Sequence, residues 1–191
     1  MGPLVMQALE YNYRFYVEQY MDTFTKVNLN HDELVRADKF VEEKITAKAT
    51  ESHHIVDGSQ EHKRSYTGVL GEMAVNKFLG FDFVDLTVGP SSNYSVPDLG
   101  SCGIKSVEWG KYPLILKVSR YPEIIVLKHN DDTLYICGIA TPLILNTFQS
   151  LDCVLSPNVI RRGEKTGFYG FDKLISPIKI KYVLESSITG R

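Results

Sequence analysis

Apolar residues recur at helical spacing in two segments of the first half of the chain. In residues 31–50 they alternate with charged groups, which predicts an amphipathic helix, and Asn30 just before it is a typical N-cap residue. Residues 66–79 predict a second helix, which Gly80 is expected to end. The expected buried faces are Leu34, Ala37, Phe40, Val41 and Ile45 in the first helix, and Val69, Leu70, Met73, Ala74, Phe78 and Leu79 in the second.

Short strand-like segments follow the second helix. An alternating segment ahead of the first helix, residues 23–29, predicts a strand as well. Helices that precede a set of short strands indicate an α/β (α+β) fold, with a mixed β-sheet core of about five strands flanked by helices. The later strands are expected over residues 81–88, 103–109, 114–118, 123–128 and 133–139.

The remaining segments carry less specific patterns. Residues 6–21 are rich in aromatic side chains, whose spacing fits a helix and a strand equally well. Residues 51–63 are polar and predict an exposed loop, and residues 143–150 predict a short helix. The basic, Gly-rich residues 161–181 predict a partly extended tail.

The composition is that of an ordinary globular protein. With 191 residues, of which 43% are hydrophobic, the chain suits a single domain. Residues 64–141 are expected to form its core, with residues 1–50 and 142–191 as extensions. No apolar run approaches the ~20 residues that cross a bilayer, and the N-terminus has no pattern of a secretory signal, so no membrane partner is expected.

The cysteine content and the net charge limit the cellular location and the modes of substrate binding that can be expected. Cys102, Cys137 and Cys153 are odd in number and widely spaced, which predicts reduced thiols and a cytoplasmic location. The formal net charge is −2, from 21 basic and 23 acidic residues. The molecule as a whole therefore has no field that attracts nucleic acid, and an anionic substrate must be held by a local group of cations.

The pattern most indicative of chemistry lies between the second helix and the strands. Asp98 follows Pro97 in a turn-like segment, Lys105 lies on the next expected strand, and Glu72 lies on the helix. Carboxylates that converge can hold Mg²⁺, which neutralises a scissile phosphate and lowers the pKa of an attacking water. A neighbouring ammonium group can orient that water. The pattern therefore points to hydrolysis of a phosphodiester bond.

These motifs resemble the PD-(D/E)xK nuclease superfamily, which has the restriction-endonuclease-like fold. Residues 68–72 (GVLGE) are similar to its helix motif, Pro97-Asp98 to its PD pair, and residues 103–106 (GIKS) to its (D/E)xK strand. Residues 135–141 (YICGIAT) resemble a strand ending in Gly that recurs in phage and bacterial members. The resemblance covers the expected core and implies hydrolysis of DNA that depends on Mg²⁺ or Mn²⁺.

One position departs from the pattern of this superfamily. Gly103 stands where the superfamily has its second acidic residue, and glycine offers no carboxylate. Glu108 is a poor substitute, because on a regular strand it points to the face opposite Lys105. We expect Glu72 to replace the missing ligand, since some members of the superfamily carry a metal-binding carboxylate on a helix.

The residues expected to contact DNA are basic. Residues 161–170 combine cations, glycines and aromatic rings, a composition that suits a nucleic-acid backbone and equally suits a solvated loop. The candidate contact residues are Arg64, Lys111, Lys117, Arg161, Arg162 and Lys165.

The sequence thus predicts a Mg²⁺-dependent deoxyribonuclease. Asp98 and Glu72 are expected to bind the metal, assisted by the backbone carbonyl of Ile104, and Lys105 to position the attacking water. A catalytically inactive DNA-binding or assembly protein of the same fold is the first alternative, and an interaction protein with no nucleic-acid role is the second. The aromatic segment 11–24 is a candidate arm for a homodimer.

Overall fold

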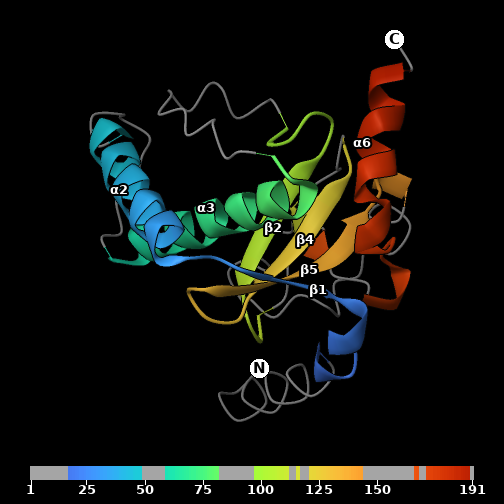
Figure 1. Cartoon of the computed structure of the whole chain (residues 1–191), viewed down its shortest axis with the longest axis horizontal. Helices are drawn as coiled ribbons and strands as arrows, with labels where there is room; N and C mark the ends of the chain where they lie inside the picture. Colours follow the sequence, from blue (N-terminus) through green and yellow to red (C-terminus); the bar gives the residue numbers. More distant parts are fainter. Residues whose placement is uncertain are drawn as a thin grey trace.

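The chain forms helices packed on a mixed β-sheet (Figure 1). A computed structural model describes residues 17–48, 59–81, 97–111, 115–116, 121–143, 166–167 and 171–189. The helices are α2 (His31–Lys48), α3 (Ser59–Leu79) and α6 (Ile180–Thr189), with 3₁₀ turns η1 (Met21–Thr23), η4 (Phe171–Lys173) and η5 (Pro177–Lys179). The strands are β1 (Thr25–Asn28), β2 (Gly103–Glu108), β3 (Ile115–Leu116), β4 (Glu123–Lys128), β5 (Thr133–Ala140) and β6 (Thr166–Gly167).

The main sheet has four described strands in the order β1-β5-β4-β2. β2 and β4 are parallel, with Gly103 opposite Glu123, whereas β5 is antiparallel to both β4 and β1. β3 and β6 form a separate antiparallel pair. The α+β class expected from the sequence is confirmed, and within the described sheet β2 is an edge strand.

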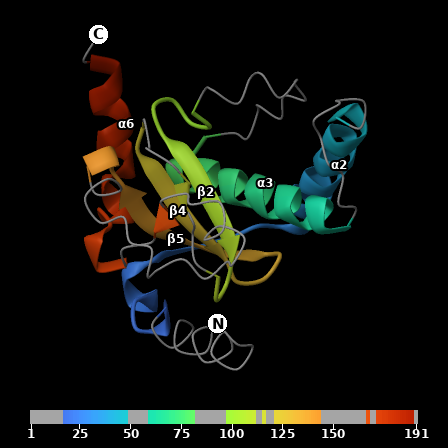
Figure 2. The same ribbon diagram turned by 180° about the vertical axis from the view of Figure 1, so that it is seen from behind.

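Helix α3 covers one face of this sheet, and α2 packs near its N-terminal end (Figures 1 and 2). Leu70, Met73 and Ala74 of α3 are buried in one apolar cluster with Ile124 and Ile136 of the sheet. The helical faces predicted from the apolar spacing are therefore confirmed, because these are the positions that the sheet buries.

The opposite face of the sheet is covered by the first described residues of the chain and by the region of η4. Val17 and Phe24 pack with Phe171 against Ile125 and Leu127 in a second apolar cluster. The rings of Phe24 and Phe171 lie 5.0 Å apart, edge to face. The described part of the proposed dimer arm is thus packed within its own chain, and residues 11–16 lie outside the described residues.

The predicted helix caps agree with the structure. The side chain of Asn30 accepts a hydrogen bond from the backbone N–H of Glu33 (2.9 Å), and Glu33 accepts one from the N–H of Asn30 (2.6 Å). This reciprocal pair is a capping box, which satisfies two N–H groups that no helical carbonyl can reach. Gly80 ends α3 with a φ of 76°, a conformation that glycine adopts at little cost.

The structure contradicts one expectation about the polar segments and adds helical turns to another. Residues 59–63, expected in a loop, form the first turns of α3, where His62 lies 3.1 Å from Asp38 of α2 and stacks on Tyr66. The segment expected to be a partly extended tail is extended at β6 and then folds into η4, η5 and the start of α6, where Ile180 is fully buried in the core. Contacts distant in sequence favour helix at both places.

Some expectations fall mainly on residues that the structure does not describe. The strand over residues 81–88 is described only at Phe81, and the short helix over residues 143–150 only at Leu143. Of residues 6–21, the structure describes only residues 17–21. These predictions stay untested.

Candidate active site at the start of strand β2

A tight turn brings Asp98 to the start of strand β2. Leu99 and Cys102 exchange backbone hydrogen bonds of 2.9 and 2.8 Å around Gly100, which has a φ of 57°. The chain thereby reverses direction, and the carboxylate of Asp98 accepts a hydrogen bond of 2.7 Å from the backbone N–H of Ile104. The PD segment and the Lys105 strand, which the sequence suggested should converge, are thus joined by a direct hydrogen bond.

The sheet register determines where the carbonyl of Ile104 points. The N–H of Gly103 bonds the carbonyl of Pro122 (2.8 Å), so the backbone groups of Gly103 face β4. Backbone groups alternate sides along a parallel strand, and those of Ile104 therefore face the outer edge, as its bond to Asp98 indicates. The Ile104 carbonyl lies on the same edge as the Asp98 carboxylate.

A carboxylate from strand β4 lies over Gly103, the position that lacks an acidic side chain. A Cβ atom placed on Gly103 would lie 2.6 Å from Oε2 and 3.1 Å from Cδ of Glu123, and 2.7 Å from a ring carbon of Tyr121. A side chain at residue 103 would displace this carboxylate or the Tyr121 ring. The space that an acidic side chain at residue 103 would enter is occupied by Glu123.

Lys105 shares a sheet face with Glu123. Along β2, Gly103, Lys105 and Val107 alternate with residues that face α3, and Val107 packs into the cluster on the far face. Burial raises the pKa of the Glu123 carboxyl from its ordinary value of 4.5 to about 7, with Asp98 adding to the increase and Lys105 opposing it. Two carboxylates and one ammonium group therefore influence one another at this end of the sheet.

Glu72 occupies a different location. It belongs to α3, which covers the face opposite Lys105, and its neighbour Gly71 lies directly against Ser106 of β2. Glu72 is half-buried there. The sequence pattern indicated Glu72 and not Glu123, whose local signal is a single acid at the first position of the strand EIIVLK, ahead of four apolar residues.

A groove of about 730 Å³ runs between the first half of α3 and the edge strand β2. Its cationic lining includes Lys63 and Arg64 from α3, Lys105 from β2, and Lys111 just beyond β2. Two of the basic residues expected to contact DNA, Arg64 and Lys111, thus line one groove together with Lys105. The other four expected contacts, Lys117, Arg161, Arg162 and Lys165, lie outside the described residues.

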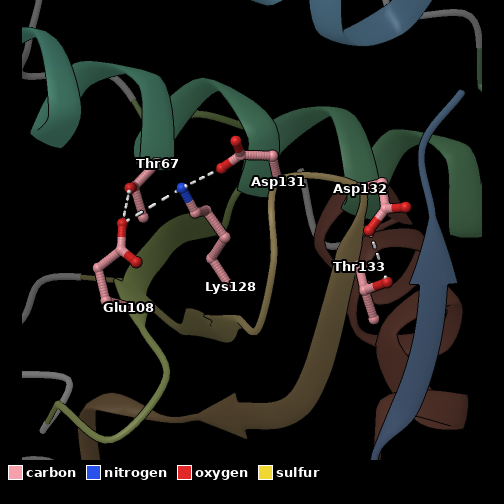
Figure 3. Close-up of polar contacts among 6 residues, drawn as sticks. All are labelled: Thr67, Glu108, Lys128, Asp131, Asp132 and Thr133. Atoms are coloured by element: carbon pink, nitrogen blue, oxygen red, sulfur yellow. Dashed lines mark hydrogen bonds and ion pairs between the residues drawn. The ribbon is translucent and has the colours of Figure 1, made fainter. Parts of the chain in front are cut away.

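One acid, Glu108, lies among these cations and is held by polar contacts (Figure 3). Thr67 of α3 donates a hydrogen bond of 2.7 Å to Oε1 of Glu108, and the Nζ atom of Lys128 lies 3.4 Å from the same oxygen. Lys128 also donates a hydrogen bond of 2.7 Å to Asp131. The prediction that Glu108 faces away from Lys105 is confirmed, because its partner Thr67 lies on α3.

Three further observations bear on the class of protein. Among the described residues, no three His, Cys, Asp or Glu side chains converge as a metal site, and no described helix has the length and apolarity to cross a membrane. Comparison with protein-family models, curated proteins and solved structures returned no match to this chain. Any function must therefore be inferred from the geometry of the site.

Proposed function

We propose that this protein is a divalent-metal-dependent nuclease that hydrolyses phosphodiester bonds in DNA, with Asp98, Glu123 and Lys105 as its catalytic residues. The observation that supports it most strongly is the position of the Glu123 carboxylate over Gly103. The sequence resembles a nuclease superfamily at every motif except this one, and a carboxylate from the adjacent strand supplies the missing group. The restriction-endonuclease-like fold is part of the same proposal.

The residues at the start of β2 fit a divalent metal ion. Two carboxylates and the outward carbonyl of Ile104 are hard oxygen donors, which Mg²⁺ and Mn²⁺ accept alongside several waters. Burial disfavours the charge on Glu123, and a cation beside it would offset that cost. Asp98, Glu123 and Ile104 would hold the ion, which when bound neutralises the phosphate and lowers the pKa of water.

Lys105 acts on the water and the phosphate. Its ammonium group can donate hydrogen bonds to the attacking water and to a non-bridging phosphate oxygen, where negative charge develops. Hydrolysis consumes one water, whose oxygen bonds to phosphorus while one of its protons passes to solvent. The bond from phosphorus to the leaving sugar oxygen breaks, and that oxygen takes a proton from solvent. Lys105 thus orients the reactants and needs no proton of its own.

Cleavage of supercoiled plasmid DNA, with Mg²⁺, Mn²⁺ or EDTA, tests this proposal. The expected result is nicking or linearisation that needs the metal and falls about a hundredfold or more in Asp98→Asn or Glu123→Gln. Lys39→Ala is a matched control, because Lys39 is an exposed residue of α2 far from β2 in sequence and paired only at its surface with Glu43. Metal-independent cleavage, or full activity in Glu123→Gln, would contradict the site.

The second candidate function is DNA binding without cleavage. The groove that carries Lys63, Arg64 and Lys111 favours it, because such a groove holds phosphates with or without a metal. Binding in EDTA together with no cleavage under any metal would select this candidate. We place either activity in the cytoplasm, since Cys102 and Cys137 are free thiols.

A further inference from the structure

The groove beside β2 combines exposed cations with a single fixed acid. Lys63, Arg64 and Lys111 are exposed, whereas Glu108 is only partly accessible, with 23% of its side chain exposed. Cations along a groove suit a phosphate backbone, but a carboxylate repels phosphate. Glu108 therefore needs a role of its own if an anionic strand occupies the groove.

Among the described residues, the side-chain partners of the Glu108 carboxylate all lie at one of its two oxygens. Oε1 receives the hydroxyl of Thr67 and faces the buried ammonium group of Lys128, which is itself held by Asp131. The dashed contacts in Figure 3 end on Oε1, and no hydrogen bond to the other oxygen, Oε2, occurs among the described residues, although Glu108 lines the groove. The fixed carboxylate thus presents one acceptor of defined direction.

We propose that the groove binds a nucleic-acid strand, with phosphates against Lys63, Arg64 and Lys111, and that Oε2 of Glu108 accepts a hydrogen bond from the amino group of a base. The substrate class rests on the proposed function, whereas the role of Glu108 concerns binding and does not depend on cleavage. Phosphate contacts hold any sequence, and a carboxylate acceptor distinguishes bases.

The expected preference follows from the edges of the bases. Adenine and cytosine present an amino group, which can donate to a carboxylate, whereas thymine presents carbonyl oxygens beside its single N–H. The wild-type protein should therefore favour a strand rich in adenine or cytosine over a thymine strand. A variant that lacks the acceptor should show less of this preference. Lys63 and Arg64 contribute equally to all three strands.

The substitution Glu108→Gln is expected to reverse this preference for adenine and cytosine over thymine. Lys128 can only donate, so the amide oxygen must stay where Oε1 is, and the amide NH₂ group takes the position of Oε2. An acceptor becomes a donor at the same point in space. Thymine, with its carbonyl oxygens, should gain from this change, and adenine and cytosine should lose.

Fluorescence anisotropy with labelled single-stranded oligonucleotides of about twelve nucleotides (dA, dC and dT) measures the preference, with EDTA present to prevent cleavage. The ratio of dC to dT affinity is expected to fall about tenfold from wild type to Glu108→Gln, the scale of a hydrogen bond to a charged group. Glu185→Gln, an exposed position on α6, makes the same charge change away from the groove and should leave the ratio unaltered. An identical ratio in Glu108→Gln and wild type would overturn the inference.

A second measurement needs no variant and covers the case in which Glu108→Gln does not fold. Replacing cytosine by N4,N4-dimethylcytosine removes both amino hydrogens, so wild-type affinity for the dC strand should fall about tenfold. Unchanged affinity would overturn the role of Glu108. A base preference without cleavage would contradict the proposed nuclease function and support the role of Glu108 in binding. Cleavage without the base preference would support the nuclease function and contradict the role of Glu108.

Discussion

Placing a carboxylate at residue 103 of strand β2, with and without the one at Glu123, tests whether Glu123 supplies the acidic group that Gly103 lacks. The single change Gly103→Glu places a Cβ 2.6 Å from Oε2 of Glu123 and 2.7 Å from the ring of Tyr121, closer than real Cβ contacts. It also adds a negative charge beside a carboxyl that burial already makes costly to ionise. We expect Gly103→Glu to lower cleavage and to leave the metal requirement in place.

The double change Gly103→Glu with Glu123→Ala removes most of that crowding. The two close approaches to Glu123 disappear, and of the three nearest atoms the ring carbon of Tyr121 remains. The new carboxylate then emerges on the same sheet face as Lys105. Glu123→Ala alone should lose about a hundredfold or more in rate, and the double variant should recover at least tenfold of that loss.

The assay is the initial rate of plasmid nicking at saturating Mg²⁺, with folding of each variant checked by circular dichroism. The variant Gly103→Gln with Glu123→Ala is the matched control, because it restores side-chain volume without charge and should stay inactive. Equal rates in the Gln and Glu double variants, both of them folded, would refute the claim that a carboxylate at this point is what matters. Wild-type activity in Glu123→Ala would refute the assignment of Glu123.

Other substitutions have defined outcomes. Asp98→Asn and Lys105→Ala should each lower the rate of metal-dependent cleavage about a hundredfold or more, with an unchanged thermal unfolding midpoint. Cleavage at the wild-type rate would show that the substituted residue is not catalytic. The pKa of Glu123 is about 7 when folded and 4.5 ordinarily, so the free energy of unfolding should fall as pH rises from 4.5 to 7. The full shift corresponds to about 3 kcal/mol, reduced to about 1–2 kcal/mol because the side chain is partly exposed. In urea unfolding without metal, Glu123→Gln should therefore be more stable than wild type at pH 8 but not at pH 4. An equal difference in stability at both pH values would contradict the raised pKa of Glu123 as its cause. Gly71→Ala should destabilise the fold by about 1–3 kcal/mol, because its Cβ would overlap the hydroxyl oxygen of Ser106, and Ser106→Gly in the same chain should restore part of the loss.

The sequence patterns correctly predicted the helices and strands that are marked by a regular spacing of apolar residues or by local capping residues. The apolar spacing of α2 and α3 identified the faces that the sheet buries, and the strand predicted over residues 123–128 coincides with β4. The cap at Asn30 and the end of α3 at Gly80 followed from backbone groups that a helix leaves unpaired at its ends. Each of these features depends on residues within a few positions of one another, which is why one sequence sufficed to find them.

Local patterns also identified part of the candidate site. Asp98 and Lys105 were selected by their spacing, and the structure joins their segments through the hydrogen bond from the Ile104 N–H to Asp98. The spacing could not show which carboxylate accompanies them. Glu72 was chosen because some members of the superfamily that the motifs resemble carry a metal-binding carboxylate on a helix, but the helix that bears Glu72 covers the other face of the sheet.

The tertiary structure alone decided the parts that depend on pairing between distant segments. Glu123 reaches Gly103 because β2 and β4 are parallel in one register, and a shift of one residue would turn its side chain to the other face. Residues 59–63 became helical through contacts with α2, and Glu108 received its fixed direction from Thr67 and Lys128. Register, burial and ion pairs across elements are properties of the folded chain, since the free energy that selects them comes from surfaces that meet only after folding.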